Sequence, residues 1–166
     1  MIDDYAAFVE SKLALVLPRG IVAPPALSAQ LFPFQRDCVR WSLESGRSAL
    51  FEDCGLGKTA QQLEWGHRVS EHTGGGRVLI LAPLAVAGQT VREGQKFGIP
   101  VTYAKTRDGQ APSGITITNY ERLDSFDPAD FAGVVLDESS ILKSFMGATK
   151  RALLSAFSRT PYRLAC

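Results

Sequence analysis

Short apolar runs alternate along the chain with segments in which apolar residues recur at helical spacing. The runs are continuous rather than alternating, which is typical of strands buried on both faces of a parallel sheet. We predict strands at residues 48–51, 77–82, 101–104, 115–118, 133–136 and 162–166. We predict helices at residues 34–43, 59–69, 86–97 and 148–157. This order predicts an α/β fold with a doubly wound, mostly parallel sheet and helices on both faces.

Residues 1–30 follow a different pattern. Asp3 and Asp4 precede apolar residues at helical spacing, which predicts a short amphipathic helix with acids at its positive end. Prolines between residues 18 and 25 then predict an extended connector. We therefore divide the chain into an N-terminal helix and proline-rich connector, residues 1–30, and one lobe, residues 31–166.

Composition limits the number of domains and the classes of partner. With 166 residues, 45% of them hydrophobic, the chain is long enough for one buried core and too short for two ordinary domains. The formal net charge is only +1, so any nucleic-acid contact must come from local groups. Cys38, Cys54 and Cys166 form no C-x-x-C pair, which argues against a disulfide framework and a zinc ribbon. We predict no signal peptide or membrane span, and therefore expect a cytoplasmic protein without membrane contact.

Residues 51–60, FEDCGLGKTA, nearly match the phosphate-binding pattern G-x-x-x-x-G-K-[ST], with an acid in place of the first glycine. The segment follows a predicted strand and precedes a predicted helix, as a phosphate loop should. Gly55 and Gly57 let the backbone curl so that successive N–H groups converge on phosphate oxygens. Lys58 adds a positive charge for the β and γ phosphates, and the Thr59 hydroxyl can ligate Mg²⁺. A glycine-rich turn that ends in lysine by chance is the structural alternative.

An acidic pair follows a different apolar strand, at residues 131–136. Asp137 should emerge at the carboxyl edge of the sheet, where ligands bind in open α/β folds. There it can hold Mg²⁺ through water, while Glu138 can polarise an attacking water as general base. An acidic turn after a core strand is the structural alternative, which the phosphate loop on another strand makes less attractive.

Together these segments resemble the motifs of superfamily 2 helicases, especially the Swi/Snf-type translocases. Residues 31–41, LFPFQRDCVRW, resemble the glutamine motif, in which Gln35 would read the adenine edge. Residues 52–59 resemble the acidic version of motif I, and residues 137–140 resemble motif II. In that version of motif I an acid, here Glu52, takes the place of the first glycine.

The resemblance implies a RecA-like P-loop domain with ATP and Mg²⁺ as cofactors. It implies catalytic roles for Lys58 and Glu138. The implied metal ligands are Thr59 and Asp137. The implied ATP-binding residues are Gln35, Cys54, Gly55, Leu56, Gly57, Lys58, Thr59 and Ala60.

Two further segments resemble motifs that grip a sugar-phosphate backbone. Residues 79–84, LILAPL, resemble motif Ia, and residues 117–121, ITNYE, resemble the motif that follows it. The resemblance therefore implies that nucleic acid contacts Pro83, Leu84, Asn119 and Tyr120. DNA is the expected partner, with RNA as the alternative.

The chain also departs from the family pattern. Ser140 stands where related enzymes often have histidine. After the last predicted strand, the family continues with a threonine-rich motif III and a second RecA-like lobe, whereas this sequence stops at Cys166. The chain thus resembles the amino-terminal lobe of phage or bacterial helicases of this kind.

The second lobe normally supplies arginines to the transferring phosphate, which contribute about 10³ to 10⁵ in rate. We therefore expect this chain by itself to bind nucleotide with little hydrolysis. We expect it to bind nucleic acid with a Kd of about 10⁻⁴ to 10⁻⁶ M.

Two other classes of function fit part of the pattern. A small P-loop kinase shares the Gly-Lys-Thr sequence, but it would leave Gln35, Asn119 and Tyr120 unexplained. A non-catalytic fragment could keep the fold and act only by binding nucleic acid or a protein partner. Preference for adenine separates the helicase lobe from the kinase, and DNA-stimulated hydrolysis with an added second lobe separates it from the fragment.

Overall fold

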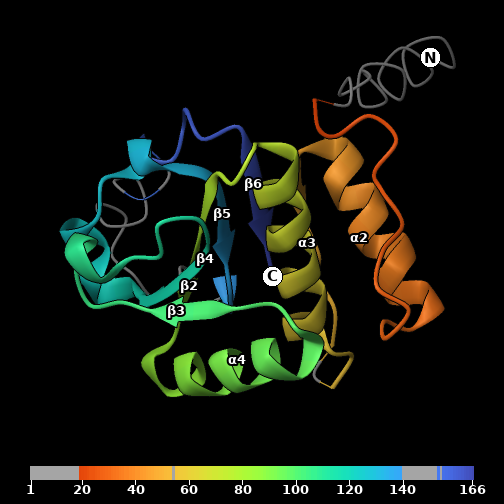
Figure 1. Cartoon of the computed structure of the whole chain (residues 1–166), viewed down its shortest axis with the longest axis horizontal. Helices are drawn as coiled ribbons and strands as arrows, with labels where there is room; N and C mark the ends of the chain where they lie inside the picture. Colours follow the sequence, from red (N-terminus) through yellow and green to blue (C-terminus); the bar gives the residue numbers. More distant parts are fainter. Residues whose placement is uncertain (1–18, 54, 140–152, 154) are drawn as a thin grey trace, which may run out of the picture.

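All strands of the central sheet run parallel, in the order β1-β6-β5-β2-β4-β3 (Figure 1). The computed structural model describes residues 19–53, 55–139, 153 and 155–166. Its strands are β1 (Arg47–Ala49), β2 (Arg77–Ala82), β3 (Val101–Tyr103), β4 (Gly114–Asn119), β5 (Phe131–Leu136) and β6 (Tyr162–Ala165). Its α-helices are α2 (Pro33–Ser45), α3 (Lys58–His72) and α4 (Leu84–Phe97).

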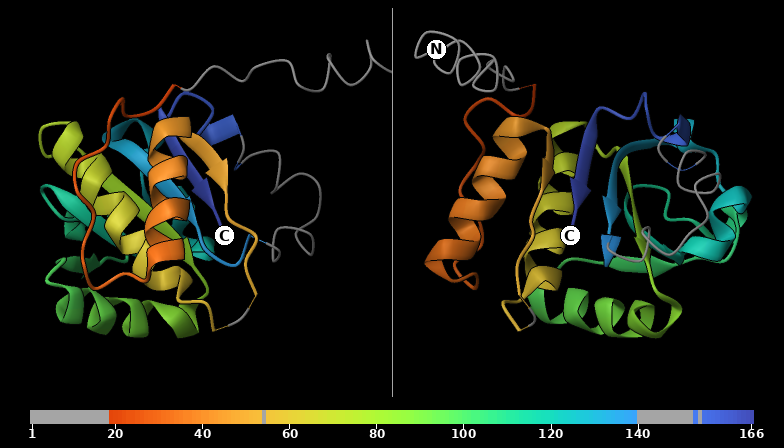
Figure 2. Two further views of the ribbon diagram at one scale, coloured as in Figure 1. Left: turned by 90° about the vertical axis from the view of Figure 1, so that its right-hand side faces the viewer. Right: turned by 180° about the vertical axis from the view of Figure 1, so that it is seen from behind.

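The side chains of the central strands divide the core into two layers. Val78 and Ile80 of β2 pack in the cluster that also holds buried residues of α2, α3 and α4. Leu79 and Leu81 pack on the opposite face with Tyr120, Leu153 and Phe157, among others. Helices α2, α3 and α4 therefore cover one face, with α2 and α3 side by side (Figures 1 and 2).

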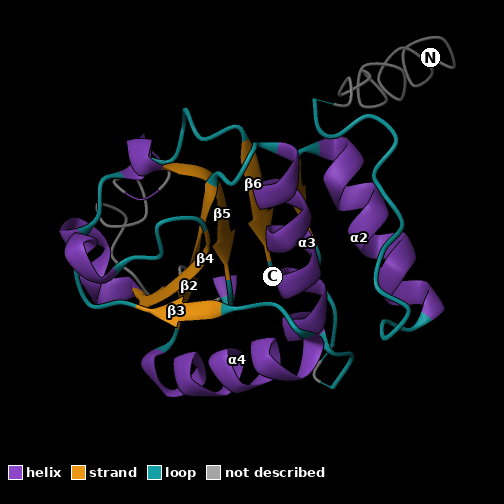
Figure 3. Cartoon of the chain, viewed as in Figure 1, coloured by secondary structure: helices purple, strands orange, loops and turns teal. Residues whose placement is uncertain are grey.

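Short 3-10 helices border the opposite face (Figure 3). They are η1 (Arg107–Gly109), η2 (Tyr120–Ser125) and η3 (Pro128–Asp130). Continuous apolar strands that are buried on both faces explain the parallel arrangement, and the architecture confirms the predicted α/β fold of RecA-like type.

Most predicted elements appear in the structure, with shifts at their ends. The strand predicted at residues 48–51 is shorter, because the chain turns into a loop and leaves the Phe51 side chain 84% exposed. The helix predicted at residues 59–69 continues to His72 as part of α3. The predicted N-terminal helix, and most of the helix predicted at residues 148–157, lie outside the described residues.

The proline-rich connector packs against α2 and α3 over its described part. The Ile21 N–H donates to the Leu43 carbonyl at 2.8 Å, and the Ile21 side chain is 3% exposed. The Ser28 N–H donates to the carboxylate of Glu64, in α3, at 2.9 Å. These contacts fix the approach to α2, although the domain boundary at residue 31 stays a prediction. Within the described ranges, no helix is long and apolar enough to cross a bilayer.

Candidate nucleotide-binding site

The carboxyl ends of the parallel strands bring several chain segments to one edge of the sheet. The phosphate loop, residues 50–57, follows β1, and the acidic turn, residues 137–139, follows β5. The Ser139 N–H donates to the Cys166 carbonyl, at the end of β6, at 2.6 Å. Because the strands share one direction, this edge is also where β2 and β4 end.

The phosphate loop depends on glycine at two positions. Gly55 and Gly57 have φ values of 86° and 76°, a region that side chains with a Cβ seldom adopt. A Cβ at Gly57 would also lie 2.5 Å from Nε2 of Gln35. α3 begins immediately afterwards, with Thr59 and Ala60 in its first turn. The predicted sequence of loop, lysine and helix start is therefore present.

Lys58 is bound to the phosphate loop itself. Its ammonium donates to the Glu52 carbonyl at 2.8 Å and to the Asp53 carbonyl at 3.0 Å. The Glu52 carboxylate accepts from Nε2 of Gln61, in α3, at 2.7 Å, so the acid of this loop is held against the helix. Cys54, which we also predicted to contact ATP, lies outside the described residues.

Gln35 is 4% exposed and bonds at both ends of its amide. Its Oε1 accepts from the Phe32 N–H at 2.9 Å, and its Nε2 donates to the Leu56 carbonyl at 2.7 Å. Gln35 therefore connects the start of α2 with the phosphate loop. The rings of Phe32 and Phe34 beside it are stacked, with centroids 6.3 Å apart, and are 66% and 44% exposed. Recognition of adenine by Gln35 stays a prediction.

Asp137, the first residue of the acidic turn, is buried and held from two sides. Asp137 is 6% exposed; its Oδ1 accepts from Nε2 of Gln62 at 2.7 Å, and its carbonyl accepts from the Tyr120 hydroxyl at 2.6 Å. Burial raises the pKa of Asp137, whereas the Gln62 bond and the charge of Lys58 act against that rise. Glu138 is exposed and has a φ of 50°, a strained value for a residue with a side chain.

The predicted nucleic-acid residues lie where two neighbouring strands, β2 and β4, end at the same edge. Pro83 caps the start of α4, and Leu84 is 61% exposed. Asn119 and Tyr120 are instead 4% and 8% exposed, and Nδ2 of Asn119 donates to the carboxylate of Glu121. Burial raises the pKa of Tyr120 well above its ordinary range, so its hydroxyl stays protonated as a donor. Contact between these four predicted residues and nucleic acid stays a prediction.

The sequence and the fold are both similar to those of known helicases. The chain is 30% identical over 159 residues to Helicase SWR1 of Debaryomyces hansenii, which covers 82% of this chain and 10% of that protein. It is 29% identical over 148 residues to mouse DNA annealing helicase and endonuclease ZRANB3, covering 79% of this chain and 14% of that protein. A solved SWI2/SNF2 ATPase core of Sulfolobus solfataricus, in complex with dsDNA, superimposes with a TM-score of 0.69. That match is 23% identical and covers 87% of this chain and 33% of the other. No protein-family model matches the sequence.

The chain is a RecA-like lobe of the SWI2/SNF2 helicase type. It spans 14% and 10% of the lengths of these two relatives. The SWI2/SNF2-type lobe therefore corresponds to a small part of each of these relatives, and their activities are not assigned to this chain.

Two residues of this SWI2/SNF2-type lobe belong to the site although the sequence analysis did not predict them. Gln61 and Gln62 lie one turn after the phosphate loop and are 0% and 1% exposed. Each donates to a carboxylate of the site, Glu52 and Asp137 respectively. Adjacent glutamines inside a helix that packs on a sheet are a usable signal, because buried amides need partners.

The oxygen atoms at this edge suit Mg²⁺, which keeps several waters and takes one or two protein oxygens together with substrate phosphates. Gln62 occupies Oδ1 of Asp137, and the Thr59 hydroxyl lies in the first turn of α3. Among the described residues, no group of three or more His, Cys, Asp or Glu side chains could hold a metal ion.

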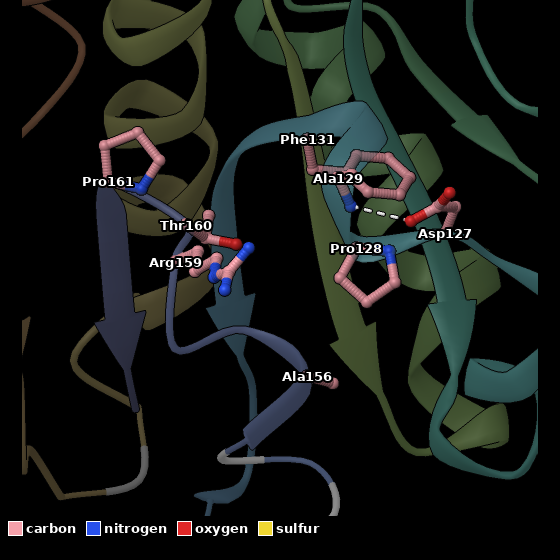
Figure 4. A pocket seen from close by; sticks show the side chains of 8 residues that line it. All are labelled: Asp127, Pro128, Ala129, Phe131, Ala156, Arg159, Thr160 and Pro161. Atoms are coloured by element: carbon pink, nitrogen blue, oxygen red, sulfur yellow. Dashed lines mark hydrogen bonds between the residues drawn. The ribbon is translucent and has the colours of Figure 1, made fainter.

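A separate cavity of about 370 Å³ lies beside the amino ends of β5 and β6, away from the phosphate loop (Figure 4). Asp127 lies on one side, where its carboxylate accepts from the Ala129 N–H at 2.9 Å, and Arg159 lies on the other. The lining residues are Asp127, Pro128, Ala129, Phe131, Ala156, Arg159, Thr160 and Pro161. None of them is a predicted site residue, so this cavity is separate from the predicted nucleotide site.

Proposed function

We propose that the chain binds Mg-ATP at the carboxyl edge of the sheet, as the ATP-binding lobe of a nucleic-acid-dependent ATPase, either a helicase or a DNA translocase. The observation that carries this proposal is the Gln62–Asp137 hydrogen bond of 2.7 Å. Gln62 lies one helical turn after Lys58, so the bond holds the acidic turn beside the lysine of the phosphate loop.

The residues of the edge have complementary roles in this proposal. Backbone N–H groups from Gly55 to Ala60 bind phosphate oxygens, and Lys58 leaves its carbonyl partners to neutralise the β and γ phosphates. Thr59 and Asp137 hold Mg²⁺, Asp137 through water. When bound, the ion neutralises charge on the transferring phosphate.

The exposed carboxylate of Glu138 orients and polarises the attacking water as general base. Glu138 follows the buried acid proposed to hold the metal, and its backbone has a φ of 50°. The strain of that conformation is typical of functional sites.

Partners enter the proposal through the relatives. The solved Sulfolobus core is in complex with dsDNA, which supports DNA as the nucleic acid bound near Pro83, Leu84 and the end of β4. A second RecA-like lobe would complete the site with arginines. Because such arginines contribute about 10³ to 10⁵ in rate, we expect the 166-residue chain to hydrolyse well below about one ATP per second.

A titration with a fluorescent ATP analogue in the presence of Mg²⁺ tests the proposal. We expect Lys58→Met to weaken binding about 10- to 100-fold, because it removes charge-assisted bonds that contribute about 1.5 to 3 kcal/mol. Lys96→Met is the matched control, since Lys96 is an exposed lysine of α4 paired with Glu93. Equal affinity of wild type and Lys58→Met, or no binding by wild type, would contradict the proposal.

A further inference from the structure

Tyr120 joins two parts of the edge that belong to different strands. It follows the last residue of β4, yet its hydroxyl donates to the Asp137 carbonyl, after β5, at 2.6 Å. β2 lies between these strands, so the bond reaches across the end of the middle strand. The tyrosine ring packs below it with Leu79 and Leu81 of β2.

Asp137 consequently has connections in two directions. Its carboxylate is bound to Gln62, in the helix that starts at the phosphate loop. Its backbone carbonyl is bound to Tyr120, in the first position of η2. A continuous path of hydrogen bonds therefore runs from α3, through Asp137, to residues 120–125.

The accepting carbonyl has a particular position in the backbone. It belongs to the peptide that joins Asp137 to Glu138, whose φ is 50°. The orientation of that peptide plane sets the direction of the Glu138 side chain. On the far side, the Ser139 N–H is bound to the Cys166 carbonyl, so the turn is held before and after Glu138.

The other end of the path reaches the surface. Asn119 is bonded to Glu121, and Glu121 and Arg122 of η2 are exposed. A ligand that contacts η2 can thus act on a segment whose first side chain is bonded to the acidic turn. By reciprocity, a nucleotide that stabilises the acidic turn, with its hydrogen bonds to Gln62 and Tyr120 kept, also stabilises η2.

We propose that Tyr120 is a positioning residue whose hydroxyl transmits nucleotide binding from the acidic turn to residues 120–125, rather than a side chain that contacts nucleic acid directly. This inference rests on the proposed Mg-ATP site. In this proposal, one hydroxyl group couples nucleotide binding at the acidic turn to residues 120–125. The family resemblance instead implies that Tyr120 contacts nucleic acid.

Amide hydrogen exchange of residues 120–126, measured with and without saturating Mg-ATP, tests the inference. In wild type we expect Mg-ATP to change exchange of this segment at least about 5-fold, the lower end of typical coupling between sites. Tyr120→Phe keeps the ring and its packing but loses the hydroxyl, so we expect a change below about 2-fold. Each variant is measured above its own Kd for nucleotide, so a shift in affinity does not obscure the result.

Tyr162→Phe is the matched control, because Tyr162 is a buried tyrosine of the same sheet, 9% exposed, with its ring against His72. We expect this variant to respond as wild type does. Tyr120→Met, which also lacks the hydroxyl, replaces Tyr120→Phe if the latter does not fold.

The outcomes separate the inference from the function on which it rests. Absence of Mg-ATP binding by wild type would overturn the proposed function. Binding without any change in residues 120–126, or an undiminished change in Tyr120→Phe, would overturn the role of Tyr120 alone.

Discussion

Two adjacent glutamines of α3 bind two regions of the site that differ in how firmly their hydrogen bonds hold them. Gln61 bonds the Glu52 carboxylate of the phosphate loop, and Gln62 bonds the Asp137 carboxylate of the acidic turn. Both side chains are fully buried, and both distances are 2.7 Å. The difference lies in what surrounds each carboxylate.

The acidic turn is held by contacts that a nucleotide would not replace. Asp137 is held by Gln62 and Tyr120, whereas the Lys58 ammonium donates to carbonyls of its own loop. Asp137 is therefore positioned before a ligand arrives. The phosphate loop must exchange internal bonds for bonds to phosphate.

Substitution of each glutamine should give the largest change in the free energy of unfolding. Gln62→Leu leaves a buried carboxylate without one donor, and we expect the free energy of unfolding to fall by about 1 to 3 kcal/mol. Gln61→Leu should cost less, about 0.5 to 1.5 kcal/mol, because Glu52 is only partly buried. Urea unfolding of both variants measures the difference. An equal or larger loss for Gln61→Leu would contradict this contrast between the two regions.

Two glycine substitutions test whether the backbone of the phosphate loop is needed for nucleotide binding. Gly57→Ala and Gly98→Ala both place a Cβ in the αL region, with φ of 76° and 69°, at a cost of about 1 to 2 kcal/mol. Only at Gly57 does the Cβ meet another group, Nε2 of Gln35, whereas nothing lies within 4 Å at Gly98. We expect Gly57→Ala to lose more stability than Gly98→Ala, because Gln35 must move, and we expect weaker Mg-ATP binding only for Gly57→Ala. Nucleotide titration and thermal unfolding of both variants separate the two effects. Unchanged affinity of Gly57→Ala for Mg-ATP would show that the backbone geometry of the loop does not contribute to binding.

The pH dependence of stability gives the smallest expected effect. Burial raises the pKa of Asp137 in the folded chain, so the folded state holds this proton more tightly than the unfolded state. This contribution to stability is present at low pH and is lost as the pH rises from about 4 through the folded pKa, by at most about 1.4 kcal/mol per pH unit.

Comparison of wild type with Asp137→Asn isolates that slope in metal-free buffer. We expect the variant to lose less stability than wild type over this window. Asp124→Asn is the control, because Asp124 is exposed. A parallel pH profile for wild type and Asp137→Asn would show that burial of this acid carries no electrostatic cost.

The sequence predicts the fold better than it predicts the site. Residues 77–82 are predictable as a strand because an uninterrupted apolar run suits only a buried element. The same reasoning overextends β1, since Phe51 is apolar yet exposed in the phosphate loop. Local composition does not reveal that the strand ends at Ala49 and a loop begins.

Only the residues inside the recognised motifs could be predicted as part of the site. The sequence places Lys58 and Asp137 at one edge, because parallel strands share their carboxyl ends. The partners of Asp137 were not predictable, because Gln62 and Tyr120 are 75 and 17 residues away from it and meet it only through the sheet order. Tyr120 matches a motif expected to contact nucleic acid, yet its hydroxyl donates to a carbonyl inside the protein.

A crystal structure with Mg²⁺ and a non-hydrolysable ATP analogue would show whether the phosphate loop rearranges on nucleotide binding while the acidic turn stays in place. We predict that Lys58 leaves the carbonyls of Glu52 and Asp53 for the phosphates, while Asp137 keeps its bonds to Gln62 and Tyr120. A nucleotide bound elsewhere, or an acidic turn that rearranges while the phosphate loop stays as it is, would contradict it.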